Sequence, residues 1–329
     1  MHPTAQDTLH HAPQTIDEAA FLDALARLKR APLDPKRGLF GPGSVFWEVN
    51  RHALPYFLGA LQSVQMQLAH PWVAQAVYEH SKVMSDPTRR RQLTYIFLWS
   101  IIYGDLDLVL RRSQALFRVH GRVRGQIPAE GGDAGRHAAG SPYHANEVGA
   151  MLWVHVTAFY CRVRLYEDLV RPLSAADKDR FVQEAKLYAF CFGIPESAHP
   201  TDWAAVEAYV AAMDTSPTLA RTEAGMKLRR FLENALPPRV RGGLWTYLGV
   251  GLPPRCAALL DQPAATPEHL ARARAVRRRL WWLQRLLPAA LTDVPAYREA
   301  RRRLAGKRGP DWLTARMNRA ILGVPSLVG

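Results

Sequence analysis

The chain has 329 residues, 48% of them hydrophobic, with 9 Trp, 11 Tyr and 11 Phe. This apolar content is enough for a sizeable core and for an apolar cavity inside it. The formal net charge is +14, but twelve Arg or Lys and only two acids lie between Leu270 and Pro310. The charge therefore belongs to one stretch, where a solvated helix face is the usual explanation, and we expect no nucleic-acid ligand.

The three cysteines stand far apart, at Cys161, Cys191 and Cys256. Because no two of them form a CxxC pair, the sequence argues against a zinc or iron–sulfur site, and the sparse, odd number fits a reducing compartment. Residues 1–15 contain no apolar core of a secretory signal. The longest apolar run, 93–104, is too short to cross a bilayer. We therefore expect a cytoplasmic protein with no transmembrane anchor.

Apolar residues recur at helical spacing almost throughout the chain, and no alternating stretch predicts a strand. Asp86 and Asp105 stand where capping side chains begin helices. Pro55 lies inside a long predicted helix and should kink it. The Gly- and Pro-rich stretch 126–142 is predicted as a loop. The predicted helices cover residues 16–29, 44–70, 89–103, 106–120, 146–171, 174–192, 202–213, 218–234, 238–249, 266–287 and 293–305.

This pattern predicts an all-α fold. Pro237-Pro238 precedes a change to Arg-rich helices. We divide the chain into a polar segment with the first helix (1–35), a core (36–235) and an Arg-rich helical region packed on that core (236–329). One large domain is favoured over two lobes, because the apolar segments of both parts need covering.

The most distinctive feature is a pair of histidines, His120 and His155, placed 35 residues apart on two apolar segments. Neutral imidazole is the commonest metal ligand, and haem iron is often held by one histidine. Arg122 and Arg124 follow His120 and would neutralise haem propionates. The alternative for His120 is a helix C-terminus, where His and Arg complement the helix dipole.

His155 sits mid-helix among apolar residues that include Trp153. A metal-ligand role competes here with the commoner role of a core histidine whose hydrogen bonds are satisfied. In that second interpretation, Thr157 and Tyr160 are the local partners that the spacing offers. Both alternatives stay open on the sequence alone.

A third group of candidates lies at two helix starts. His70 precedes Pro71 and either lines a pocket or simply ends a helix. Arg90 and Arg91 near the start of a buried helix oppose the helix dipole, so a propionate or an acidic side chain nearby would explain them. Thr94, about one turn along, would then face the cavity. The alternative is a solvated first turn.

These segments resemble the MpaB oxygenase family, whose catalytic domain is shared with the rubber-cleaving latex clearing proteins. The resemblance covers roughly residues 36–235, with several short motifs in the same order. The motifs are FGPGSVFW from Phe40, HPWVA from His70 with His80-Ser81, RRQLT from Arg90, VHGRVRG from Val119, YHANE from Tyr143 and LWVHVT from Leu152.

The resemblance implies an all-α domain enclosing a pocket for non-covalent haem b, with His120 as the axial iron ligand. Arg90 and Thr94 would lie near the distal side of the haem, with His155 as a catalytic group or second ligand. Rubber-cleaving members carry a lysine just before the motif threonine, whereas this chain has Leu93. The candidate cofactor-binding residues are His120, His155, Arg90, Arg91, Arg122, Arg124, His70 and Trp153.

The resemblance therefore implies a haem b-dependent oxygenase that uses O₂ and an electron donor to oxidise or cleave a small apolar substrate, either saturated or unsaturated, other than polyisoprene. The alternative is a haem protein with two histidine ligands that serves electron transfer or sensing. A third class, a membrane-surface or nucleic-acid binding protein, would use the basic stretch 270–310.

Overall fold

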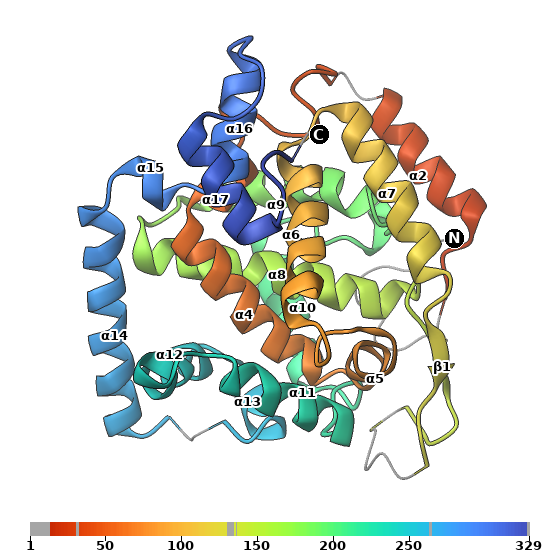
Figure 1. Ribbon diagram of the computed structural model, residues 1–329. Helices are drawn as coiled ribbons and strands as arrows, with labels where there is room; N and C mark the ends of the chain where they lie inside the picture. Colours follow the sequence, from red (N-terminus) through yellow and green to blue (C-terminus); the bar gives the residue numbers. More distant parts are fainter. Residues whose placement is uncertain (1–13, 31–32, 130–134, 136, 263–264, 328–329) are drawn as a thin grey trace.

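Helices make up nearly all of the regular structure (Figure 1). The computed structural model describes residues 14–30, 33–129, 135, 137–262 and 265–327, so most of the polar N-terminal segment, residues 1–13, lies outside this part. The elements are α2 (Glu18–Arg30), α3 (Val45–Arg51), α4 (Ala53–Leu68), α5 (Pro71–His80), α6 (Pro87–Tyr103), α7 (Leu106–His120), β1 (Arg124–Gln126), β2 (Pro142–His144), α8 (Val148–Leu169), α9 (Ala175–Phe190), the 3-10 helix η1 (Glu196–Ala198), α10 (Trp203–Thr215), α11 (Glu223–Asn234), α12 (Pro238–Val250), α13 (Pro254–Leu259), α14 (Pro267–Leu286), α15 (Ala289–Thr292), α16 (Pro295–Leu304) and α17 (Trp312–Leu322).

Capping side chains begin several of the helices that the sequence predicts. The carboxylate of Asp86 accepts a hydrogen bond from the Arg89 N–H at the start of α6 (3.0 Å). Asp105 accepts one from the Leu108 N–H at the start of α7 (2.8 Å). Each cap satisfies a backbone donor that the first helical turn leaves free. The predicted all-α fold is confirmed, although α5, α13, α15 and α17 were not predicted.

The predicted helix 44–70 is two helices, α3 and α4, which meet at His52. Pro55 has no N–H, and its ring excludes the carbonyl of Arg51, four residues earlier, from the helical hydrogen bonds. That carbonyl instead accepts a hydrogen bond from the Val294 N–H (2.7 Å). His52 also forms an isolated bridge with Asp293. The expected kink at Pro55 is therefore a break three residues earlier, and the C-terminal region occupies it.

Two short strands contradict the expectation that the chain contains none. β1 pairs with β2 in antiparallel register, with Arg124 opposite His144. Each strand has three residues, which is too short for alternating hydrophobicity to appear in the sequence. Because β1 follows α7 and β2 precedes α8, the pairing brings the end of α7 beside the start of α8.

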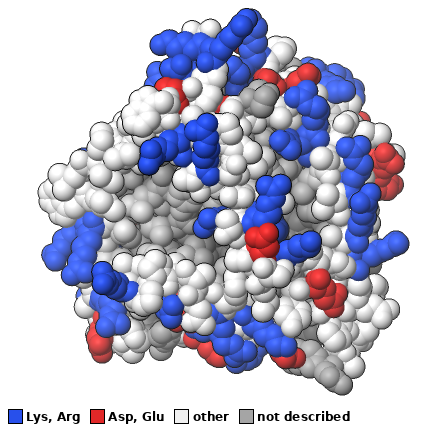
Figure 2. All heavy atoms as spheres, in the orientation of Figure 1, with Lys and Arg blue, Asp and Glu red and all other residues white. Residues whose placement is uncertain are grey.

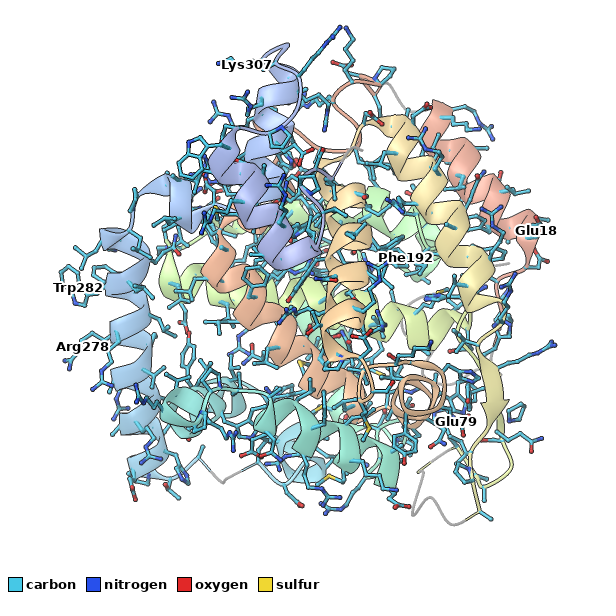
Figure 3. The ribbon with its side chains drawn as sticks, in the orientation of Figure 1. Glu18, Glu79, Phe192, Arg278, Trp282 and Lys307 are labelled. Carbon is cyan, nitrogen blue, oxygen red and sulfur yellow. The ribbon has the colours of Figure 1, made fainter. Side chains whose placement is uncertain are left out.

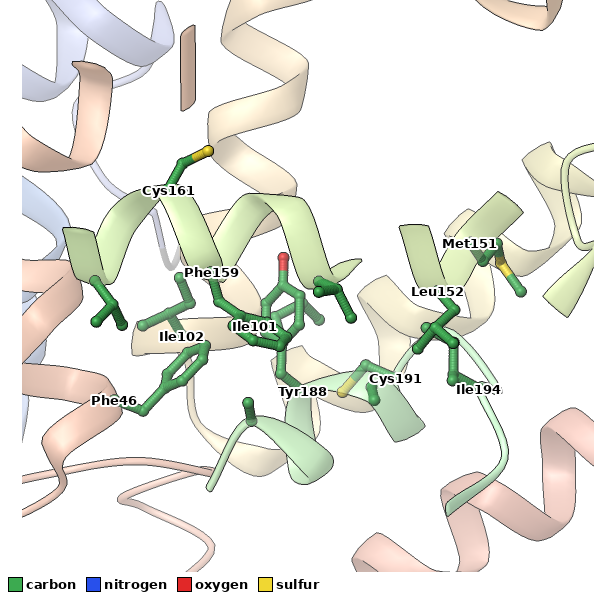
Figure 4. Packing of buried hydrophobic residues seen from close by; sticks show 14 of the residues in the cluster. Phe46, Ile101, Ile102, Met151, Leu152, Phe159, Cys161, Tyr188, Cys191 and Ile194 are labelled. Atoms are coloured by element: carbon green, nitrogen blue, oxygen red, sulfur yellow. The ribbon is translucent and has the colours of Figure 1, made fainter. Parts of the chain in front are cut away.

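The core is built around α8, most of whose residues are buried. Figure 4 shows Phe159 of α8 packed near Tyr188 of α9 and Ile101 of α6. α4 lies against α8, and Gly59 of α4 stands at the closest approach. A Cβ at Gly59 would come within 3.0 Å of the Cα of Arg162. The missing side chain at Gly59 therefore sets the distance between these two helices.

We expect Gly59→Val to lower the free energy of unfolding by about 1–3 kcal/mol, because the added methyl groups would push α4 away from α8. Gly242→Ala in α12 is the matched control, since a Cβ there would meet no atom within 4 Å. It should stabilise the protein by roughly 0.5–1 kcal/mol through helix propensity. Urea unfolding of both variants checks this, and equal midpoints would contradict the close packing.

The Arg-rich C-terminal helices belong to the same domain as the core. Arg303 of α16 donates a hydrogen bond to the Tyr103 carbonyl at the end of α6 (2.7 Å). Asp293 forms an ion pair with Arg51 of α3 (3.2 Å). α14 packs on α12 and α8, and α17 packs on α6. The protein is thus a single all-α domain.

Candidate functional site

The segments around His120 come from α6, α7 and the residues just before α8. Gly104 and Asp105 join α6 to α7, and these two helices contact each other. His120 ends α7 and is partly buried. Burial and the nearby charge of Arg90 lower its pKa to about 4, while a side-chain hydrogen bond with Asn146 opposes them. The imidazole of His120 is therefore neutral at pH 7, the form in which histidine binds a metal.

Arg90 joins two of the motif segments. Its Nε donates to the Ser81 hydroxyl (2.9 Å), and its Nη1 donates to the Thr94 hydroxyl. Arg90 is an exposed residue as a whole, yet burial of its guanidinium lowers its pKa. Neither Arg90 nor Arg91 forms an ion pair with an acid in the described part of the chain. The structure therefore groups His120, Arg90 and Thr94.

Four other predicted cofactor residues, Arg122, Arg124, His70 and Trp153, lie outside α6 and α7. Arg122 and Arg124 are exposed, in the turn after α7 and in β1. His70 is buried at the start of α5, with its ring centroid 5.2 Å from that of His137. Trp153 is fully buried, and its indole N–H donates to the Met66 carbonyl (3.3 Å).

His155 faces a partner that the sequence interpretation missed. Its Nε2 lies 3.0 Å from Nε2 of His199, and Nδ1 of His199 lies 2.9 Å from the Pro200 carbonyl. A carbonyl only accepts, so Nδ1 of His199 is the donor and its Nε2 accepts the proton of His155 Nε2. Nδ1 of His155 then carries a lone pair. In the described structure this atom is buried and has no hydrogen-bond partner.

Aromatic rings surround this pair. The ring of Tyr188 stacks on His155 at 5.7 Å between centroids, and Phe159 meets it edge-on at 5.0 Å. Burial lowers the pKa of both histidines, that of His199 to about 4. For His155, the charge of Arg162 acts in the same direction. Both imidazoles therefore stay neutral well below the pH at which a solvated histidine gains its proton.

We expect the free energy of unfolding to fall as the pH is lowered from 7 to 5. The unfolded chain protonates His199 from about pH 6.5 downward, whereas the folded chain does so only near pH 4. The unfolded state thus binds more protons in this window, which costs on the order of 2 kcal/mol of stability by pH 5. Urea unfolding of the parent and of His199→Gln checks this; identical pH slopes would contradict it.

Arg162 is the second residue that the sequence interpretation missed. It is 4% exposed, and its Nη1 donates to the Asn50 side chain (3.0 Å). Its guanidinium lies 4.4 Å from the ring centroid of Tyr56, while its Nε has no partner within the described residues. None of the ion pairs found there includes Arg162. A buried charge without a counter-charge is costly, so Arg162 suits an anionic ligand.

The group of His120, Arg90 and Thr94 and the buried residues of α8, His155 and Arg162, border the same two helices, α6 and α8. Tyr95 follows Thr94 in α6, and its ring lies 6.2 Å from that of Tyr56, on which Arg162 stacks. Asn146, beside His120, precedes α8, which carries His155 and Arg162.

No cluster of three or more His, Cys, Asp or Glu side chains able to hold a metal ion occurs in the described ranges. A haem iron, held by its porphyrin, needs only one or two protein ligands.

A family model matches residues 47–288, and its description is ER-bound oxygenase mpaB/B'/rubber oxygenase, catalytic domain. The chain belongs to this family. No curated protein and no solved structure matches it. The match includes His120, Arg90, His155, His199 and Arg162, and it ends just after α14. Oxygenase activity is thus the activity of the family, and the resemblance inferred from the motifs is confirmed. The match extends past residue 235, where the motif resemblance ended, and includes the Arg-rich helix α14.

None of the helices described in the structure is both long enough and apolar enough to cross a membrane.

Proposed function

We propose that this family member is a haem b-dependent oxygenase that acts on a small apolar, unsaturated substrate. The observation that carries the proposal is His120, a partly buried imidazole kept neutral beside Arg90 and Asn146. The sequence has no CxxCH motif, so the haem would be bound without covalent attachment.

The residues present fit this cofactor. His120 would hold the iron, and Asn146 would orient its ring, as groups outside the first coordination shell commonly do. The propionates need cations that are not already paired with acids. Arg90 and Arg91 in α6, and Arg122 and Arg124 just after His120, form no ion pair with an acid of the described residues. Within the same residues, Nε of Arg162 in the core has no hydrogen-bond partner. When bound, haem b supplies the iron that activates O₂ and carries the redox chemistry.

The polar groups of the chain would act around the cofactor by hydrogen bonding. The Arg90 guanidinium holds the Thr94 hydroxyl in place. The lone pair on Nδ1 of His155 would accept a hydrogen bond from a donor in the site, and His199 fixes the tautomer that presents it. Phe159 and Tyr188 exclude water from this pair. The protein would thus position the polar groups around the cofactor and exclude water from the two histidines.

An apolar substrate has a suitable surface beside these groups. Figure 2 shows a hollow over α4, between α14 and α6. Apolar side chains at helical spacing, Leu54, Phe57 and Leu61, are only partly buried on α4. The ring of Phe57 lies 5.1 Å from that of Tyr95, the neighbour of Thr94. We infer that the substrate enters by this hollow. Leu93 in place of the rubber enzymes' lysine argues against polyisoprene.

A haem with two histidine ligands is the second candidate, and it is favoured by Nδ1 of His155, a buried atom to which the described residues offer no hydrogen bond. Such a protein would transfer electrons or sense a ligand. The free thiols of the three buried cysteines support a cytoplasmic location for either function.

The absorption spectrum of the purified protein tests the proposal. We expect a Soret band, and in the ferrous protein a spectrum that changes when O₂ or carbon monoxide is added. O₂ consumption by the reduced protein should then depend on an unsaturated lipid or isoprenoid compound. A low-spin spectrum typical of two histidines in both oxidation states, without turnover, would support the second candidate. A protein purified from haem-supplemented cells without any Soret band would contradict both.

A further inference from the structure

The outer surface of α14 and α15 exposes an unusual number of large apolar side chains. Five of them lie within ten residues and form what we call the apolar patch: Trp282, Leu283, Leu286, Leu287 and Leu291. Leu286 is 75% exposed and Trp282 is 52% exposed. Single exposed apolar residues are ordinary, but a contiguous group of this kind marks an interaction surface.

Arginines adjoin the apolar patch on the same helix. Six of them, all exposed, lie between residues 272 and 285, and no acid occurs from 269 to 292: the six are Arg272, Arg274, Arg277, Arg278, Arg279 and Arg285. None forms an ion pair with an acid of the described residues. This run of positive charge is therefore not neutralised by any acid of the part that the structure describes.

The basic and apolar parts share one face of α14. Arg278, Trp282 and Leu286 follow one another at intervals of four residues, which places them in one row along a helix. Figure 3 shows Arg278 and Trp282 pointing away from the body of the protein. In Figure 2, Lys and Arg gather along α14, next to an uncharged surface. The opposite side of α14 packs on α12, so the helix is held with this face outward.

A shallow pocket of about 640 Å³ lies within the basic part. Its lining includes Arg274, Arg277 and Arg278, together with Trp281 and Trp282. Guanidinium groups bind phosphate oxygens well, and tryptophan prefers the boundary between lipid headgroups and acyl chains. The pocket thus combines the groups that recognise a phospholipid headgroup.

We propose that α14 and α15 bind the surface of an anionic phospholipid bilayer, with a headgroup phosphate in this pocket and the apolar patch in the headgroup–acyl boundary. A helix with Lys or Arg beside exposed Trp and Leu binds membranes in this manner. Nucleic acid would satisfy the arginines but would leave the five apolar side chains in water. The lipid surface is the partner whose chemistry matches both parts.

The test is co-sedimentation of the full-length protein with vesicles. We expect binding to vesicles of phosphatidylcholine mixed with phosphatidylglycerol, weaker binding at high salt, and little binding to phosphatidylcholine alone. Arg274→Gln with Arg278→Gln should weaken binding about 25-fold, because each arginine near an anionic surface contributes about fivefold. Trp282→Ser with Leu286→Ser should weaken it at least tenfold.

Matched controls come from the far side of the molecule (Figure 1). Leu22→Ser in α2 and Arg111→Gln in α7 remove an exposed leucine and an exposed arginine there and should bind vesicles like the parent. Circular dichroism confirms that each variant is folded. The proposal is overturned if the parent stays in the supernatant with anionic vesicles, or if the patch variants bind as the controls do. It is also overturned if the patch variants only convert a dimer to a monomer, or if the protein binds duplex DNA but no vesicles.

Discussion

Purified His120→Ala is expected to lose nearly all of its Soret absorption, whereas the parent retains one haem per chain. The reason is that His120 is the neutral imidazole that Arg90 and Asn146 bracket, and removing it leaves the iron without its protein ligand. The measurement is the ratio of haem, assayed as the pyridine complex, to protein. Added imidazole should restore part of the haem binding, since it occupies the space of the missing side chain.

The control for this variant is His269→Ala in α14, which lies outside both candidate groups and should keep the haem content of the parent. His155→Ala tests the competing assignment, in which His155 is the iron ligand. Full haem content and an unchanged spectrum in His120→Ala, together with loss of haem in His155→Ala, would transfer the ligand role to His155.

His155→Ala is expected to change the affinity of the haem iron for cyanide about tenfold or more, while haem content changes little. The Nδ1 lone pair of His155 lies in a dry aromatic setting, where loss of a polar group has a large electrostatic effect. His199→Leu should reproduce much of this change, because His155 loses the acceptor that fixes its tautomer. Cyanide titration, followed in the Soret region, measures both.

The conservative variant His199→Gln separates positioning from packing. Its amide oxygen can still accept the proton of His155 Nε2, so its cyanide affinity should stay close to that of the parent. If His155→Ala, His199→Leu and His199→Gln all bind cyanide like the parent, His155 is a core histidine with no contact to the cofactor.

Helix starts were predictable because their signals are local. Asp86 and Asp105 cap the helices that follow them through contacts three residues along the chain. The end of α3 was not predictable in this way. It depends on Val294, which reaches the Arg51 carbonyl from the other end of the sequence. Local propensity placed the bend at Pro55, and a tertiary hydrogen bond moved it to His52.

In the candidate site, too, residues with local sequence signals were predictable, and contacts between residues far apart in the sequence were not. His120, Arg90 and Thr94 were found from spacing and motifs, because each lies in a short local motif and Arg90 and Thr94 are four residues apart on one helix. For His155, spacing suggested Thr157 and Tyr160, but the Thr157 hydroxyl donates to the Trp153 carbonyl (2.7 Å). The actual partner, His199, lies 44 residues away, beyond the range of helical periodicity.

Arg162 carried a signal that the sequence interpretation did not use. It follows His155 by seven residues, which is two helical turns, so both side chains lie on the same buried side of α8. A charged residue on the buried side of an apolar helix is costly unless a partner compensates it. That cost is visible in the sequence alone, whereas the missing counter-charge is visible only in the structure.

The hydrogen bond between Arg51 and Val294 bears on how the protein is made. Synthesis proceeds from the N-terminus at roughly 5–20 residues per second. When the helices that carry His120 and His155 have left the ribosome, the residues that occupy the junction of α3 and α4 have not yet been added. The junction of α3 and α4 in the nascent chain therefore stays uncovered until the segment that contains Asp293 and Val294 has been synthesised. Truncation before Asp293 should leave a chain that chaperones and proteases treat as unfinished.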